Sequence, residues 1–333
     1  MKDKDNTVLV SIICDTFNHE MYIRQCLDGF ITQKTDFLFE VLIHDDASTD
    51  GTADIIREYK TEYPDIIKPI YQTENQYSKK IKIWEAYQFP RAKGKYIALC
   101  EGDDYWTDPY KLQKQVDFME KNPDYGMVFT NTYHYIEKKK KLIIPKPTTN
   151  YNILDIFNAN PIRLLTVLFE KHSLLECSQY LINNNTETFD YPIFLWFSNF
   201  SKIHCLTDIT GVYRIIPNSM THSKDIDKRI SFQQKRYKTQ YFAVSNYDIE
   251  IDKSRVEYEH YYKCYTECLL YDKNKQRINE YKKYFKKNNV SKIKNILIRY
   301  SLKNDIIEFL IIKTIFLLRN LLNIKNCTKI RKG

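Results

Sequence analysis

The sequence predicts an α/β fold in which a doubly wound, mostly parallel sheet occupies the first part of the chain. Short apolar runs rich in β-branched residues alternate with segments whose apolar residues recur at helical spacing. Such alternation is typical of parallel sheets covered by helices. The 333 residues are 43% hydrophobic, which is enough for a sizeable core. The 7 glycines and 10 prolines are too few for a fibrous or low-complexity chain.

The predicted elements follow one another in regular order. Residues 8–14 form a compact β-rich run, and after Asn18 the apolar residues between Tyr22 and Ile31 fall on one helical face. The alternation then continues with strands at 39–44, 67–71, 96–100 and 127–133 and with helices at 52–63, 81–87 and 109–120. The helix at 109–120 has a typical start, because Asp108 precedes Pro109 at the first helical position.

The regular alternation stops after the four lysines at 138–141, and a mixture of strands, turns and short helices is expected from there to residue 224. We therefore predict one domain over residues 1–224, with a regular half over about residues 1–135 and an irregular half over about residues 136–224. A second, mostly helical part follows over residues 225–333.

The positive charge of the chain is concentrated near its end. Residues 271–333 carry 17 lysines and arginines against 4 aspartates and glutamates. Within this stretch, residues 305–324 predict an amphipathic helix whose charged residues, among them Lys313, leave a broad apolar face. A spanning helix needs roughly 20 apolar residues, so we expect either a helix on a membrane surface or one docked on the protein's own core or on a second subunit.

The cysteines and the first residues predict the compartment. The 8 cysteines contain no C-x-x-C pair and several lie in apolar runs, which favours reduced, buried thiols. The short apolar run near the start resembles a strand more than a signal peptide. We expect a cytoplasmic protein, peripheral at the inner face of the membrane if the helix at 305–324 binds lipid.

Two acidic turns predict a metal site. Asp103 and Asp104 come directly after the predicted strand at 96–100, and Asp45 and Asp46 follow the strand at 39–44. Because parallel strands deliver their carboxyl ends to one edge of a sheet, these carboxylates are expected to face a common ligand. Hard oxygen ligands suit Mg²⁺ or Mn²⁺ holding a diphosphate. The alternative is a solvated acidic turn that caps the following helix.

The turn Thr16-Phe17-Asn18, the turn Asp45-Asp46-Ala47-Ser48-Thr49-Asp50-Gly51 and the motif Glu101-Gly102-Asp103-Asp104 occur in an order that resembles a family 2 glycosyltransferase. The resemblance covers about residues 7–224. It implies the glycosyltransferase A fold, a Rossmann-like sheet, with a donor half over about residues 1–135 and an acceptor half over about residues 136–224.

The resemblance also implies roles for individual residues. Thr16, Phe17 and Asn18 would touch the nucleobase, and Asp45 and Asp46 would hold the base and ribose. Asp103 would lie near the ribose and the metal, with Asp104 the direct metal ligand. The remaining residues implied are Asp190 as catalytic base, with Glu187 as its fallback, Arg214 near the diphosphate, and Thr166, Trp196 and His222 on the acceptor side.

Two of these roles have structural alternatives. Asp190 could instead be the N-cap of the helix that follows it, since aspartate is a preferred capping residue. Arg214 suits bidentate phosphate contact, but it could equally pair with an acid of the site.

The implied reaction is the inverting transfer of one sugar from a nucleoside-diphosphate sugar, expected to be UDP-linked, to an acceptor hydroxyl of a glycan or lipid-linked acceptor in bacterial surface polysaccharide assembly. The segment Gln233-Gln234-Lys235-Arg236-Tyr237 is similar to a signature of processive synthases, but we interpret it as a chance match on a solvated helix. Competing hypotheses are a sugar nucleotidyltransferase, whose glycine-rich loop is missing near the first strand, and a non-catalytic membrane-surface scaffold. Nucleic acid is not expected as a partner, because the candidate site is acidic.

Overall fold

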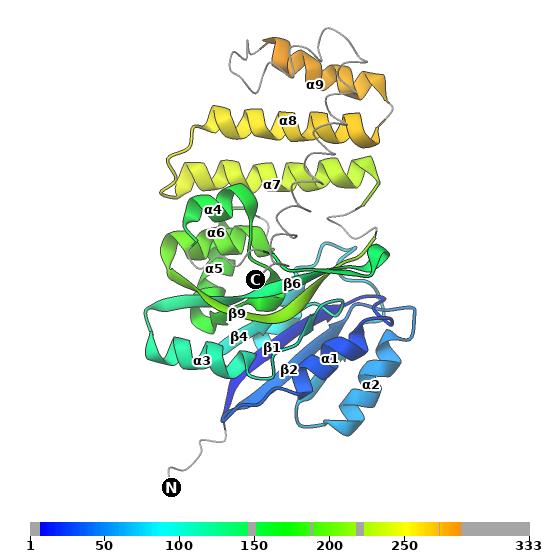
Figure 1. Ribbon diagram of the computed structural model, residues 1–333, viewed down its shortest axis with the longest axis vertical. Helices are drawn as coiled ribbons and strands as arrows, with labels where there is room; N and C mark the ends of the chain where they lie inside the picture. Colours follow the sequence, from blue (N-terminus) through cyan, green and yellow to red (C-terminus); the bar gives the residue numbers. More distant parts are fainter. Residues whose placement is uncertain (1–6, 146–150, 187–188, 218–222, 273, 288–333) are drawn as a thin grey trace, which may run out of the picture. The chain divides into compact units, whose positions relative to one another are not determined.

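The computed structural model describes residues 7–145, 151–186, 189–217, 223–272 and 274–287. Its sheet has nine strands in the order β3-β2-β1-β4-β8-β6-β9-β5, with β7 paired to β6. Figure 1 labels β1, β2, β4, β6 and β9 among them. The strand bounds are β1 Val8–Thr16, β2 Leu38–Asp45, β3 Ile67–Tyr71, β4 Tyr96–Leu99, β5 Tyr105–Trp106, β6 Tyr125–Ile136, β7 Lys141–Ile143, β8 Leu168–Glu170 and β9 Lys202–Ile215.

The predicted α/β class is confirmed, and the parallel pairing holds for the first four strands. β1 pairs in parallel with β2 and β4, and β2 pairs in parallel with β3. The sheet then changes direction, because β8 pairs antiparallel with both β4 and β6, and β5 pairs antiparallel with β9. Because β1 to β4 are parallel, their carboxyl ends lie along one edge of the sheet. The antiparallel strands β8, β6, β9 and β5 widen the sheet beyond β4.

Helices cover the sheet as the apolar spacing predicts. In the first part of the chain they are α1 Ile23–Ile31, α2 Thr52–Glu62, α3 Lys111–Lys121, α4 Ile153–Ala159, α5 Lys171–Asn183 and α6 Asp190–Phe200. Leu27 of α1, Ile56 of α2 and Leu112 of α3 are fully buried in one cluster with Ile12 of β1 and Val41 of β2. Burial of this shared apolar surface fixes the three helices on the sheet.

The prediction of an ordinary helix at 81–87 is wrong. The chain instead forms a π-helical turn at Trp84–Gln88, followed by a 3₁₀ turn at Phe89–Arg91 that contains Pro90. Proline supplies no backbone N–H and restricts the residue before it, so a regular α-helix cannot continue here. Wide π-helical turns are frequently found at functional sites.

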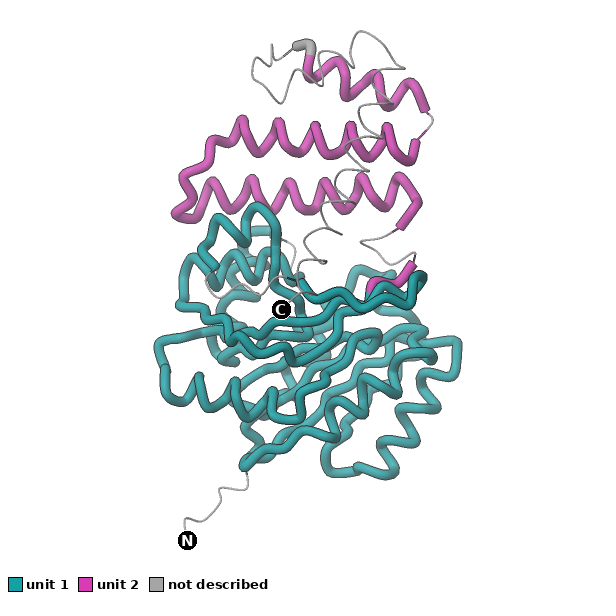
Figure 2. The backbone as a smooth tube through the Cα atoms, viewed as in Figure 1, with its two compact units in different colours: residues 1–214 teal, residues 215–333 magenta. Residues whose placement is uncertain are grey.

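The chain separates into two compact units, residues 1–214 and residues 215–333 (Figure 2). Described helices of the second unit are α7 Ile226–Asn246, α8 Lys253–Tyr271 and α9 Lys275–Lys287. The segment Gln233–Tyr237 lies within α7, where Tyr237 stacks on His260 of α8 with ring centroids 4.4 Å apart. The amphipathic helix predicted at 305–324 lies outside the described residues. In the described part of the chain, no helix combines the length and apolar character needed to cross a bilayer.

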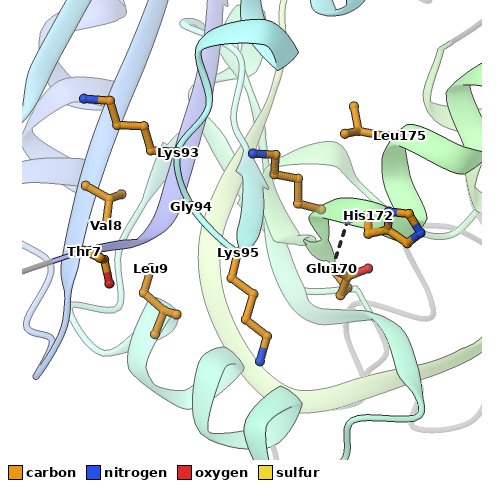
Figure 3. A pocket seen from close by; sticks show the side chains of 10 residues that line it. Thr7, Val8, Leu9, Lys93, Gly94, Lys95, Glu170, His172 and Leu175 are labelled. Carbon is orange, nitrogen blue, oxygen red and sulfur yellow. Dashed lines mark hydrogen bonds between the residues drawn. The ribbon is translucent and has the colours of Figure 1, made fainter. Parts of the chain in front are cut away.

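The seven cysteines that the structure describes are buried and form no disulfide, which agrees with the prediction of reduced thiols. A hollow of about 530 Å³ lies where β1 and β4 begin and β8 ends (Figure 3). The acidic turns follow the opposite, carboxyl ends of β2 and β4. The lining of the hollow includes Lys93, Lys95 and Lys171, and the carboxylate of Glu170 accepts a hydrogen bond from the backbone N–H of His172 there.

Candidate functional site

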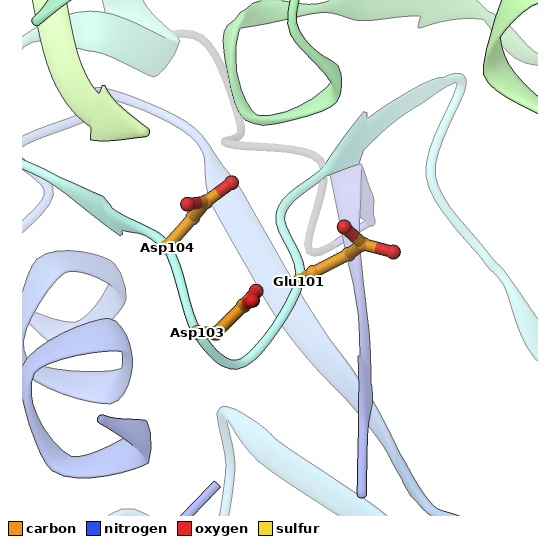
Figure 4. A group of neighbouring side chains, drawn as sticks. All are labelled: Glu101, Asp103 and Asp104. Atoms are coloured by element: carbon orange, nitrogen blue, oxygen red, sulfur yellow. The ribbon is translucent and has the colours of Figure 1, made fainter. Parts of the chain in front are cut away.

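The turn after β4 brings three carboxylates together at the carboxyl edge of the parallel strands. One carboxylate oxygen from each of Glu101, Asp103 and Asp104 lies within 4.8 Å of the other two (Figure 4). The chain reverses at Gly102, where a Cβ would lie 2.7 Å from Thr16 Oγ1 and 2.9 Å from His19 Nδ1. Only glycine lets the turn approach the end of β1 this closely. The structure thus places together the acids of the predicted metal motif.

Burial and mutual repulsion change how these carboxyl groups hold protons. Glu101 reaches solvent but is closely surrounded by protein, and loss of water raises its pKa to about 8, with the charges of Asp103 and Asp190 adding to the rise. Asp104 is buried, and this burial, together with the charge of Asp103, raises its pKa well above the usual range. Such a group keeps protons at neutral pH unless a cation replaces them. A donor set of hard oxygens suits Mg²⁺ or Mn²⁺.

The two acids of the second turn have different surroundings. Both are nearly inaccessible to solvent. Asp46 accepts backbone N–H bonds on both carboxylate oxygens, from Gln76 at 2.6 Å and from Tyr77 at 3.0 Å, so it anchors the loop after β3. Asp45 accepts a hydrogen bond from the hydroxyl of Ser48, and burial raises the pKa of Asp45.

The turn after β1 lies beside the second turn. Asn18 has a left-handed backbone with φ 54°, and its Oδ1 accepts the backbone N–H of Thr49 at 2.8 Å. Thr16 is buried at the end of β1, whereas 43% of the surface of Phe17 is exposed to solvent. An exposed aromatic ring at a sheet edge is available for stacking by a flat ligand.

Asp190 is the first residue of α6. Its Oδ1 accepts the backbone N–H of Tyr191 at 2.8 Å, and the side-chain amide of Asn160 donates to its Oδ2 at 3.4 Å. The N-cap residue of α6 is Phe189, so the alternative interpretation of Asp190 as the N-cap is wrong. Its charge helps raise the pKa of Glu101, so its carboxylate lies within electrostatic reach of the acidic turn.

Two of the residues predicted on the acceptor side are buried and make contacts within the protein. Thr166 is buried, and its hydroxyl donates to the carbonyl oxygen of Arg163 at 2.7 Å. Trp196 is buried in α6, where it contacts Phe197 and Phe200. His222 and the fallback base Glu187 lie outside the described residues.

The sequence predictions missed Asp15, which precedes Thr16 on β1. Its two carboxylate oxygens accept hydrogen bonds from the indole N–H of Trp84 at 2.7 Å and from the amide of Gln88 at 2.8 Å. Burial raises the pKa of Asp15 to about 6. The available signal was a carboxylate at the end of an apolar run, which is the signal that identified the two acidic turns.

Comparisons with known proteins agree with this arrangement. The model of glycosyl transferase family 2 matches residues 11–178. An uncharacterized protein of Mycobacterium tuberculosis is 46% identical over 122 residues, or 36% of this chain and 34% of that protein. The Bacillus subtilis protein TuaG, named for glycosyl transfer in teichuronic acid biosynthesis, is 26% identical over 223 residues, or 65% of this chain and 82% of TuaG.

Among solved structures, TarS of Staphylococcus aureus in complex with UDP-GlcNAc superimposes with a TM-score of 0.53 at 17% identity, covering 87% of this chain and 78% of that chain. This likeness shows a common fold, that of the glycosyltransferase A enzymes. The match to the mycobacterial relative spans about a third of that protein's length.

Proposed function

This chain belongs to glycosyl transferase family 2, and we propose that it transfers one sugar from a nucleoside-diphosphate sugar, UDP-linked, to an acceptor hydroxyl with inversion at the anomeric carbon. The observation that carries this proposal is the cluster of Glu101, Asp103 and Asp104 at the carboxyl edge of the parallel strands, within electrostatic reach of Asp190. In open α/β sheets, ligands bind in the crevice at this edge.

Asp104 and Asp103 would hold a divalent cation, Mn²⁺ or Mg²⁺, with Glu101 beside them. The fit is supported by oxygens that lie within 4.8 Å of one another and by carboxyl groups whose pKa values are raised, first by burial and then by the charges of the neighbouring acids. When bound, such a cation neutralises charge that develops on a diphosphate leaving group, a contribution of several kcal/mol.

The other residues of the site have roles in proton transfer and in donor binding. Asp190 accepts the proton of the attacking hydroxyl as general base, and one base acting opposite the leaving group gives inversion in a single displacement. Phe17 stacks on the nucleobase at the rim, with Thr16 and Asn18 shaping its turn. Asp45 receives polar groups of the base or ribose. Asp46 supports the donor site by anchoring the loop at Gln76 and Tyr77.

The acceptor belongs to surface polysaccharide assembly in this proposal, as a glycan or lipid-linked hydroxyl. The name of TuaG, a relative covering 65% of this chain, supports a polysaccharide pathway, and the UDP-GlcNAc complex of TarS supports a UDP-linked donor. The enzyme acts in the cytoplasm in this proposal, and the amphipathic helix predicted at 305–324, within the basic segment 271–333, brings it to the inner face of the membrane. Thr166, Trp196 and His222 remain predictions for the acceptor side.

A panel of nucleotide sugars tests the proposal. With Mn²⁺ present, we expect one donor to release its nucleoside diphosphate when a glycan or lipid-linked acceptor is added. UDP with Mn²⁺ should raise the unfolding temperature of the wild-type protein, because only a ligand-binding native state is stabilised by mass action.

Asp104→Ala should abolish both effects, while Asp117→Asn on the exposed face of α3 serves as the matched control. A protein that neither hydrolyses nor binds any donor would instead be the non-catalytic scaffold.

A further inference from the structure

Arg214 reaches the acidic turn through a strand pairing that connects distant parts of the chain. The short strand β5 directly follows the turn and pairs antiparallel with β9, with Tyr105 opposite Val212 and Trp106 opposite Gly211. This register places Arg214, near the end of β9, beside Asp104. The backbone N–H of Arg214 donates to Oδ1 of Asp104 at 2.7 Å. A metal ligand of the proposed site is thus oriented by the main chain of β9.

The guanidinium of Arg214 is held on several sides. Its Nη1 donates to the backbone carbonyl oxygen of Asp103 at 2.6 Å, and its Nη2 donates to Oε1 of Gln25 on α1. Its central carbon lies 4.5 Å from the ring centroid of Tyr105 and 5.1 Å from that of Tyr22. Planar guanidinium groups favour this combination of directional donors and aromatic faces.

These contacts occupy a donor on each Nη of Arg214 and so leave little of its guanidinium for a ligand. A diphosphate bound by a forked pair of hydrogen bonds needs an accessible edge of the guanidinium. Here, one edge is directed at the backbone of the acidic turn and at the neighbouring helix.

We propose that Arg214 is a positioning residue for cation binding and does not itself bind the diphosphate: its guanidinium fixes the backbone of Asp103, and its main-chain N–H fixes the carboxylate of Asp104. This inference rests on the proposed function, because it concerns the same metal site. Groups that orient metal ligands in this way commonly contribute about 10- to 100-fold to metal affinity.

The direction in which substitution of Arg214 changes the metal affinity distinguishes a geometric role from an effect of its charge. A guanidinium beside the carboxylates repels an incoming cation, so loss of its charge alone would strengthen metal binding. Lysine keeps the charge but lacks the planar fork that joins Asp103 to Gln25. A loss of affinity in Arg214→Lys therefore reports lost orientation.

The test is a titration of the full chain with Mn²⁺ alone, followed by electron paramagnetic resonance of the free ion. We expect Arg214→Lys to weaken Mn²⁺ binding by about 10- to 100-fold. Gln25→Ala, which removes one anchor from an exposed position on α1, should weaken binding in the same direction by less. Arg24→Ala, an exposed arginine on the same helix that pairs with Glu58, is the matched control and should leave binding unchanged.

Kinetics with the donor that the nucleotide-sugar panel identifies provide a second measurement. Saturating Mn²⁺ should restore most of kcat in Arg214→Lys and leave the KM for the donor close to the wild-type value. Unaltered Mn²⁺ affinity in both variants, together with a donor KM that rises at every Mn²⁺ concentration, would overturn the inference and assign Arg214 to the diphosphate. If Arg214→Lys does not fold, Gln25→Ala decides alone. Failure of the proposed function is distinct, since the wild-type protein would then use no donor.

Discussion

At the scale of single residues, the carboxylate of Asp190 lies on the helix that approaches the acidic turn, held by Tyr191 and Asn160. We predict that Asp190→Asn retains donor binding and lowers turnover by about 10²- to 10⁴-fold, the usual size of a general-base effect. Asparagine preserves the shape but cannot take the proton. Nucleoside-diphosphate release measures turnover, and UDP-dependent thermal stabilisation measures binding.

The control for this variant is Asp124→Asn, a surface carboxylate paired with Lys202, which should keep full activity. Undiminished turnover in Asp190→Asn would remove Asp190 as the base.

Asp15 supplies a prediction for pH. Burial raises its pKa from the ordinary 3.8 to about 6, so the native state holds this proton more tightly than the unfolded chain does. The stabilisation is therefore fully present below about pH 4 and is lost as the pH rises through 6. We expect the free energy of unfolding of the wild-type protein, relative to Asp15→Asn, to fall by up to about 3 kcal/mol between pH 4 and pH 7.

Urea unfolding across this pH range measures the difference. The exposed Asp117→Asn is again the reference, and its difference from the wild type should stay constant. A pH-independent difference for Asp15→Asn would show that Asp15 titrates normally.

At the scale of elements, the approach to β4 depends on the absence of a side chain at Gly94. A Cβ there would lie 2.4 Å from the backbone nitrogen of Ser11 and 2.7 Å from the carbonyl carbon of Val10, both on β1. Backbone cannot move aside without disturbing the β1–β4 pairing. Gly94→Ala should therefore lower the free energy of unfolding by about 1–3 kcal/mol, the usual cost of overpacking.

Gly51→Ala is the matched control for Gly94→Ala. The three atoms nearest to its Cβ would all belong to the flexible, exposed side chain of Glu20, the closest at 2.8 Å. This side chain can rotate away at the cost of the hydrogen bond that it accepts from the backbone N–H of Gly51, so a smaller change of about 0.5–1 kcal/mol is expected. Equal effects of the two substitutions on urea unfolding would contradict the close approach at β4.

Most elements of the first half could be predicted because each is encoded locally. A run such as that in β1 or an apolar face such as that of α2 is visible within about ten residues of sequence. The apolar spacing predicts an ordinary helix where the structure has the π-helical turn at Trp84–Gln88. This turn donates hydrogen bonds to Asp15, which is about 70 positions away, and local spacing carries no signal for such contacts. The strand β8 has three residues, too few for a periodic signal.

The candidate site divides in the same way. Asp103 and Asp104 were found because they follow an apolar run directly. The contacts of Arg214 with Asp104 and Gln25 join residues 110 and 189 positions apart, and no local pattern records such a pairing. The family resemblance located Arg214 near the site, but only the strand register shows which of its atoms face the acids.

At the scale of the whole molecule, the basic end of the chain supplies a separable prediction. Residues 271–333 carry 17 lysines and arginines against 4 acids, and such segments bind anionic lipid. A protein shortened to residues 1–300 loses 7 of these lysines and arginines together with the amphipathic helix predicted at 305–324, and it should therefore bind phosphatidylglycerol vesicles less than the full chain in a sedimentation assay. Neutral phosphatidylcholine vesicles are the control. Equal sedimentation of both proteins would favour a helix docked on protein.

The pairing of β5 with β9 also determines when, during synthesis and folding, the acidic turn reaches its final structure. Synthesis proceeds from the amino terminus, and Glu101 leaves the ribosome while the residues of β9 are still to be translated. Until β9 is added, Asp104 lacks its main-chain donor. A nascent chain or proteolytic fragment that stops before residue 211 therefore has every acid of the cluster but lacks the strand that orients Asp104, so the proposed cation site is complete only after β9 has paired with β5.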